Sequence, residues 1–182
     1  MTWPNSQRLI VLVGPSGAGK DSVLRAWRER STGAGLYFVE RLITREADPD
    51  GEAHRPATRE ALAEMHLRGE LAWHWTAHGL RYAVHRDALA PLASGASVVL
   101  NGSRAHLPVM RRGAPLLRVV EITAPPSVRA ARLAARSREA EAARLARLQR
   151  SVNGFEPDLR LVNVGPLDVV VDALDGWWRA LE

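Results

Sequence analysis

The chain has 182 residues, of which 46% are apolar, so it is long enough to bury one substantial core but short for two independent domains. It carries a formal net charge of +5 and no cysteine, which excludes disulfides and thiolate metal sites. No apolar run approaches the ~18 residues of a membrane span, and the first residues lack the pattern of a secretory signal. We expect one domain over residues 1–182 that is soluble and cytoplasmic.

Strands and helices are predicted to alternate along the chain. Residues 8–13 (RLIVLV) form an apolar run that ends in glycine, as expected for a strand buried on both faces of a parallel sheet. Residues 20–30 place apolar side chains at helical spacing. Further strands are predicted at residues 36–39, 97–100, 116–123 and 159–164. The alternation predicts an α/β fold with a five-stranded parallel sheet flanked by helices.

The C-terminal segment, residues 167–181, is open to two interpretations. Three consecutive valines at 169–171 favour a strand, whereas the apolar positions from Leu167 to Leu181 follow i, i+3, i+4, i+7 spacing. We predict an amphipathic helix that closes the sheet. Residues 44–56 are the least regular stretch and form a loop long enough to be functional.

A glycine-rich turn follows the first predicted strand. Residues 14–20 (GPSGAGK) match G-x-x-x-x-G-K, and Lys20 is the only lysine in the chain. In such a turn, backbone N–H groups and a helix N-terminus face a nucleotide's phosphates, and the lysine reaches the terminal phosphates. A turn without a ligand is the alternative, which the complete pattern disfavours. The expected ATP-binding residues are Gly14, Pro15, Ser16, Gly17, Ala18, Gly19, Lys20, Asp21 and Ser22, with Lys20 catalytic.

Asp21 replaces the Ser or Thr that normally offers a hydroxyl to magnesium. A carboxylate near the triphosphate would be repelled by ~4 kcal/mol at about 4 Å and an effective dielectric of about 20, unless a cation lies between them. The predicted strand at 97–100 leads into Asn101, where many P-loop enzymes carry a metal-binding aspartate. The hypothesis is that Asp21 is a ligand of Mg²⁺, directly or through water. The alternative is that Asp21 only favours the positive first turn of its helix.

Six arginines fall within residues 127–147. In small-molecule kinases a mobile lid places arginines over the transferring phosphate. We expect two of the six to act in this way, with Arg132 and Arg136 as the catalytic candidates, and the rest to form a solvated face. A nucleic-acid patch is disfavoured because no aromatic residues interleave. The six are Arg129, Arg132, Arg136, Arg138, Arg144 and Arg147.

Five segments together resemble the guanylate kinase superfamily and, more closely, the ribose 1,5-bisphosphate phosphokinase (PhnN) family. They are GPSGAGKDS at 14–22, LITREADPDGEAH at 42–54, AHGLRYAV at 77–84, LNGSRAHLP at 100–108 and the segment 122–141. The resemblance implies a P-loop NTPase fold with a small acceptor-binding insertion at about 40–86 and a lid at about 127–147. It also implies transfer of the ATP γ-phosphoryl group to the 1-phosphate of ribose 1,5-bisphosphate, with Mg²⁺.

The resemblance also implies the acceptor site. Guanylate kinases carry Gly-Ser/Thr after the tyrosine that corresponds to Tyr82, and the hydroxyl helps recognise guanine; here Ala83 and Val84 stand there, so Val84 cannot make that bond. The expected binding residues for a phosphate-rich acceptor are Arg41, Thr44, Arg45, Glu52, His54, Arg81, Tyr82, Asn101, Ser103 and Arg104.

Two other functions remain in view. A nucleoside monophosphate kinase is disfavoured by Val84, and an inactive guanylate kinase-like binding module is disfavoured by the intact Lys20. The expected partner is a phosphorylated sugar, with no nucleic acid and no membrane, in a monomer or homodimer. The six histidines form no convincing metal set, and we predict no structural zinc.

Overall fold

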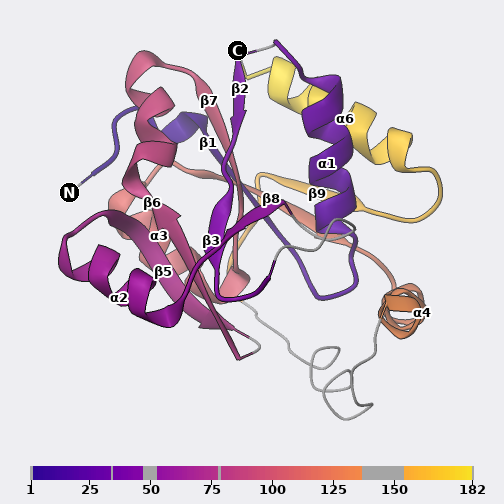
Figure 1. The fold of residues 1–182 in the computed structure, drawn as a ribbon. Coiled ribbons are helices and arrows are strands. Elements are labelled where there is room, and N and C mark those ends of the chain that lie inside the picture. The colour runs from indigo at the N-terminus through magenta and orange to yellow at the C-terminus, as the bar shows by residue number, and fades with distance from the viewer. Residues whose placement is uncertain (1, 34, 47–52, 78, 137–153, 182) are drawn as a thin grey trace.

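A five-stranded parallel sheet forms the centre of the molecule (Figure 1). The computed structural model describes residues 2–33, 35–46, 53–77, 79–136 and 154–181. The strand order is β2-β7-β1-β8-β9, and every neighbouring pair is parallel. The strands are β1 (Leu9–Val13), β2 (Leu36–Phe38), β7 (Ser97–Asn101), β8 (Arg118–Thr123) and β9 (Leu159–Val162). The predicted parallel sheet is confirmed, with strand ends that differ from the prediction by a few residues.

Helices cover both faces of this sheet, which is why its central strand is apolar throughout. All five residues of β1 are buried. On one face, Ile10 and Leu12 pack with residues of α1 (Lys20–Arg30) and α6 (Leu167–Arg179), which lie side by side. On the other face, Leu9 and Val11 pack with η2 (Arg86–Ser94) and α3 (Leu107–Gly113). The helix predicted at the C-terminus is confirmed, because burying one stripe of α6 accounts for its spacing.

A second sheet lies beside the first, in the order β4-β3-β6-β5. It consists of β3 (Arg41–Ile43), β4 (His54–Pro56), β5 (Leu71–Ala77) and β6 (Leu80–His85), and α2 (Arg59–Leu67) packs against it. Trp73 of β5 and Val84 of β6 enter the same apolar cluster as Leu100 of β7. The small sheet is therefore packed against the carboxyl half of the parallel sheet.

The remaining described elements are short or peripheral. They are η1 (Ser6–Arg8), η3 (Arg104–His106) and α4 (Pro126–Arg136), which begins directly after β8. The rest of the expected lid, residues 137–147, lies outside the described residues. In the ranges that the structure describes, no helix is long and apolar enough to cross a membrane.

Candidate active site

The glycine-rich turn is held at the carboxyl end of β1, between β8 and the first turn of α1. A Cβ added to Gly14 would lie 1.9 Å from the carbonyl oxygen of Ile122 in β8, so no larger residue fits there. Gly19 caps the N-terminus of α1 with a φ of 85°, which residues other than glycine rarely adopt. The turn is thus shaped by its contacts with the sheet, and the helix N-terminus adds positive potential to it.

Lys20 lies over this turn. Its Nζ donates hydrogen bonds to the carbonyl oxygens of Gly14, at 3.1 Å, and of Pro15, at 3.4 Å. The ammonium therefore sits at the mouth of the turn, within reach of any anion that the turn binds.

Asp21 and Asn101 meet beside the turn. The Asn101 amide Nδ2 donates to Asp21 Oδ1 at 3.0 Å, and Asn101 is 5% exposed. Its Oδ1 is buried and has no hydrogen-bond partner in the described residues. An unsatisfied buried acceptor costs roughly 1–3 kcal/mol, so a missing partner is expected.

This pair of oxygens fits a hard cation. Carboxylate and amide oxygens are the ligands that Mg²⁺ prefers, and Mg²⁺ commonly takes one or two protein ligands and completes its shell with phosphates and water. Within the described ranges, no group of three or more acidic or histidine side chains could hold a metal by itself. Asp21 and Asn101 are therefore compatible with a magnesium ion that arrives with a nucleotide.

The first arginines of α4 hold the outside of the turn. Arg129 Nε donates to the Ser16 carbonyl oxygen at 3.0 Å, and Arg132 donates to the Ala18 carbonyl oxygen at 3.3 Å. Burial lowers the pKa of the Arg129 guanidinium. Arg136 is the last residue of α4, and its side chain lies outside the described part, as do Arg138, Arg144 and Arg147.

Asn163 also supports the turn, and the sequence analysis missed it. Its Nδ2 donates to the Ala18 carbonyl oxygen at 2.8 Å, and the residue is 3% exposed. A Cβ on Gly19 would lie 2.4 Å from this nitrogen. The signal in the sequence was an uncharged polar residue near the end of the predicted strand at 159–164.

An aromatic cluster joins the small sheet to η3, in the segment after β7. Trp75 and Tyr82 stack with their ring centroids 5.5 Å apart and their planes 6° apart, and His106 stacks on Trp75 at 5.1 Å. The Arg41 guanidinium lies over Tyr82 at 4.9 Å and over Trp75 at 5.5 Å. Arg41 and Tyr82 were predicted site residues, whereas Trp75 and His106 were not. Nothing in the predicted pattern of strands and helices indicated that Trp75 and His106 would lie in contact.

Curated relatives decide the family. Proteins named ribose 1,5-bisphosphate phosphokinase PhnN are 41% identical in Burkholderia mallei, over 97% of this chain and 100% of the relative, and 43% identical in Pseudomonas fluorescens, over 92% of each. The relative of that name in Thiobacillus denitrificans is 42% identical over 85% of this chain and 82% of its own length. This chain belongs to the PhnN family of ribose 1,5-bisphosphate phosphokinases. No family model matches the chain.

Solved structures share the fold of this PhnN family member at low sequence identity. A guanylate kinase from Anaplasma phagocytophilum superposes with a TM-score of 0.65 over 94% of this chain and 84% of its own, at 19% identity. A gluconokinase from Sinorhizobium meliloti gives a TM-score of 0.51 over 100% and 95%, also at 19% identity. The predicted P-loop kinase fold is thereby confirmed.

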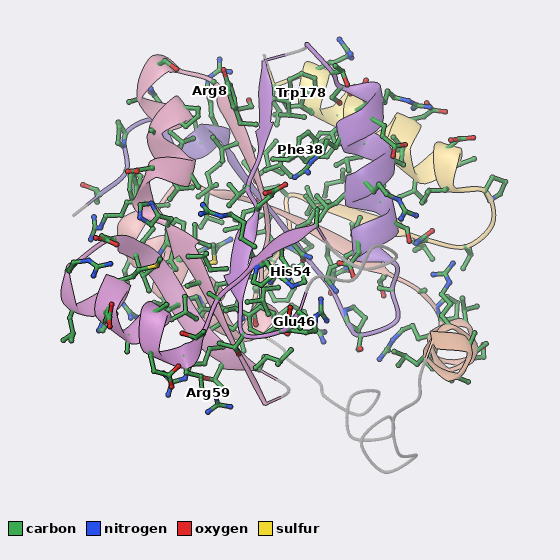
Figure 2. All side chains as sticks on the ribbon, in the orientation of Figure 1. Arg8, Phe38, Glu46, His54, Arg59 and Trp178 are labelled. Carbon is green, nitrogen blue, oxygen red and sulfur yellow. The ribbon has the colours of Figure 1, made fainter. Side chains whose placement is uncertain are left out.

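The other predicted acceptor residues of the PhnN member lie around the edge of the small sheet. Thr44 Oγ1 accepts a hydrogen bond from the Arg81 backbone N–H at 2.8 Å, and a ring nitrogen of His54 donates to the Arg45 carbonyl oxygen at 3.1 Å. Figure 2 shows His54 close to Glu46 in the middle of the view, well below Trp178. The side chains of Arg45 and Arg81 are exposed. His54 thus supports the backbone from which Arg45 projects.

The remaining residues near the predicted acceptor site differ in their exposure. Ser103 and Arg104 are half-buried and follow Asn101 in the segment that leads into η3. Glu52 lies outside the described residues. Val84, which stands where guanylate kinases carry a hydroxyl that helps recognise guanine, is fully buried in the main core with Trp73 and Leu89, because its side of β6 faces the parallel sheet. A ligand cannot touch Val84 in this conformation.

His106 has an uncommon electrostatic environment for a histidine. Burial, together with nearby His74 and Arg112, lowers its pKa to about 4. The ring is therefore uncharged at neutral pH. Its Nε2 is buried and has no hydrogen-bond partner in the part of the chain that is described.

Proposed function

We infer that this PhnN family member transfers the γ-phosphoryl group of ATP to the 1-phosphate of ribose 1,5-bisphosphate. The products are ADP and 5-phospho-α-D-ribose 1-diphosphate (PRPP). The observation that carries this inference is the 41–43% identity, over most of both chains, to curated relatives whose shared name states this acceptor. The reaction belongs to phosphonate catabolism and PRPP biosynthesis, in the cytoplasm.

The donor side uses the turn at 14–22. An oxygen of the acceptor's 1-phosphate attacks the γ-phosphorus, the bond to the β-phosphate oxygen breaks, and its electron pair leaves with ADP. Charge spreads over the transferring oxygens in this step, so catalysis consists mainly of positioning and neutralisation. Lys20 turns from the Gly14 and Pro15 carbonyl oxygens to the phosphates, and Arg132 and Arg136 neutralise charge from α4.

Asp21 and Asn101 are the residues that would hold Mg²⁺, since their oxygens fit a hard cation. When bound, the ion supplies positive charge to the nucleotide's phosphates. The Asn101 amide donates a hydrogen bond to Asp21, which keeps the two side chains beside each other.

The acceptor side uses residues of the insertion at about 40–86 and of the segment after β7. Arginine guanidinium groups bind phosphates through paired, charge-assisted hydrogen bonds. Arg41, Arg45, Arg81 and Arg104 supply them, with Tyr82, Thr44, Ser103, His54 and Glu52 around the sugar and its phosphates.

The aromatic cluster supports an acceptor without a base. A base inserted between two rings needs about 7 Å between them, two contacts of ~3.5 Å. The ring centroid of Trp75 lies 5.5 Å from the ring centroid of Tyr82 and 5.1 Å from that of His106. A base therefore cannot insert between the two rings of either stack.

Release of ADP from ATP with ribose 1,5-bisphosphate or GMP tests the function directly. We expect kcat/KM for ribose 1,5-bisphosphate to exceed that for GMP by at least about two orders of magnitude, because GMP's base would leave about two hydrogen bonds of ~1.4 kcal/mol each unmade. Similar constants, or a higher one for GMP, would instead make the chain a nucleoside monophosphate kinase. No release with either acceptor would favour an inactive binding module.

A further inference from the structure

We propose that Trp75 is a positioning residue of the acceptor site, which holds Arg41 and Tyr82 in the orientation in which they meet a phosphate group of the acceptor. The proposal rests on the function proposed above and adds to it a residue outside the expected site.

The Arg41 guanidinium lies over two aromatic faces at once. Its Cζ is 4.9 Å from the ring centroid of Tyr82 and 5.5 Å from that of Trp75, and Arg41 is 6% exposed. A cation within about 6 Å of an aromatic face is attracted to it, most strongly when water is excluded. Two such faces restrict the positions of a long, flexible side chain. The ordering of Arg41 is then complete before the acceptor binds, which reduces the entropy lost on binding.

Trp75 is itself fixed from two directions. Tyr82 is its cross-strand partner in the β5–β6 pair, and the two rings are nearly parallel. His106 reaches Trp75 from η3, in the segment that also carries Ser103 and Arg104. Trp75 therefore connects β3, β6 and the segment after β7, the three places that supply the acceptor residues. A shift of its ring would disturb all three.

The charges in the cluster agree with this role. Because burial lowers the pKa of His106 to about 4, its ring does not compete with Arg41 as a cation over Trp75 at neutral pH. Among the described residues, the cation that lies over the Trp75 and Tyr82 rings is Arg41, whose guanidinium suits a phosphate.

Trp73 provides an internal comparison for a role in packing alone. It lies two residues before Trp75 on β5, so both side chains point to the same face of the small sheet. Trp73 is 5% exposed and belongs to the main apolar cluster. Its ring centroid lies 6.3 Å from that of Trp3. Trp75 is only half-buried and packs at the edge of that cluster. If Trp75 only filled space, its substitution would resemble that of Trp73.

The experiment measures kcat and KM for both substrates in the full chain carrying Trp75→Leu, Trp75→Phe or Trp73→Phe, with melting temperatures alongside. We expect Trp75→Leu to lower kcat/KM for ribose 1,5-bisphosphate by at least about tenfold, the loss of one desolvated cation–π contact, and to change KM for ATP by less than about twofold. Trp75→Phe keeps an aromatic face that attracts a cation less strongly, and it should lower kcat/KM for ribose 1,5-bisphosphate about threefold. Trp73→Phe should lower the melting temperature and leave the acceptor constants within about twofold.

A double-mutant cycle tests the route through Arg41. In an Arg41→Met background, Trp75→Phe should cost less than about 1.5-fold, because the cation it positions is gone. The proposal would be overturned if the Arg41→Met and Trp75→Phe effects on kcat/KM for ribose 1,5-bisphosphate were independent. It would also be overturned if Trp73→Phe and Trp75→Phe lowered that constant equally, or if Trp75→Phe lowered the constants for ATP and for the acceptor equally. If Trp75→Leu does not fold, the Trp75→Phe comparisons decide alone. A wild-type chain that fails to phosphorylate ribose 1,5-bisphosphate would overturn the proposed function instead.

Discussion

At the scale of single residues, Lys20 gives the most direct test of the kinase site. Its ammonium is held by the Gly14 and Pro15 carbonyl oxygens, and its side chain is not part of the described apolar clusters. Lys20→Ala should therefore abolish ADP release and leave the melting temperature within a few degrees of wild type. Arg25→Ala, an exposed position on the same helix, is the control. Transfer within a few-fold of wild type in Lys20→Ala would contradict the site.

His106 predicts a pH dependence of stability. Its pKa of about 4 in the folded chain is below the ordinary 6.5, so between these values the unfolded chain binds a proton that the folded chain excludes. The free energy of unfolding should fall as pH falls from 6.5 toward 4. Because His106 is half-buried and solvent partly screens its charge, we expect a loss of a few degrees in melting temperature. His106→Gln should reduce the drop between pH 7.0 and 4.5; an unchanged drop would show that the ring is not excluded from protonation.

The residues of the site differ in how far sequence could predict them. Lys20 and Asp21 lie within one turn and are fixed by local spacing, so a motif identifies them. Trp75 and His106 meet only because β5 lies against the segment after β7, and no local pattern encodes that contact. The burial of Val84 was not predicted for the related reason that the face of β6 it occupies depends on how the small sheet packs.

At the scale of elements, Asp175 joins α6 to α1. Its Oδ1 accepts from Trp27 Nε1 at 3.1 Å, and its Oδ2 from Arg179 Nε at 2.7 Å. Burial alone would raise the pKa of this carboxyl, but the hydrogen bonds from Arg179 and Trp27 outweigh it and hold the pKa below its ordinary value. Asp175→Ala removes the hydrogen-bond partner of the fully buried Trp27 indole. The free energy of unfolding, measured with urea at pH 7, should therefore fall by ~1–3 kcal/mol.

The control is Asp172→Ala on the same helix. Asp172 pairs with Arg30 at the exposed surface, and such pairs contribute ~0–1 kcal/mol. The contribution of Asp175 is present above the ordinary pKa of its carboxyl, 3.8, and is lost as pH falls below it. The gap between wild type and Asp175→Ala should therefore narrow at pH 3. If the two variants lost the same free energy of unfolding at pH 7, the proposed role of Asp175 in joining the helices would be wrong.

The elements themselves were predictable to different degrees. Strands β1 and β7 bury continuous apolar runs, and helices α1 and α6 bury regular stripes, which sequence periodicity detects. The strands β3 and β4 have three residues each, and β4 contains a proline and two exposed positions. No apolar run or periodic pattern marked these two strands, so only the resemblance to a family indicated the insertion.

At the scale of the whole molecule, nucleotide and metal should stabilise the fold together. A non-hydrolysable ATP analogue with Mg²⁺ at about 100 times its Kd should add ~2.7 kcal/mol to the free energy of unfolding, or roughly 5–10 °C in melting temperature. Removing the metal with EDTA should reduce this gain in the wild type, and Asp21→Asn should reduce the difference between the two conditions. The same gain with and without EDTA in the wild type would mean that Asp21 and Asn101 do not hold the ion.

The position of β1 in the sheet also affects how the chain folds. Leu9 pairs with Val98 and Ile10 with Arg118, so both neighbours of this early strand are made in the second half of synthesis. Gly14 is likewise packed against Ile122, and Asp21 is held by Asn101. During synthesis β1 is an unpaired apolar strand for a long interval, which is the situation in which chains aggregate or need chaperones. Ability to bind nucleotide should therefore appear late and abruptly in refolding, when the sheet closes around β1.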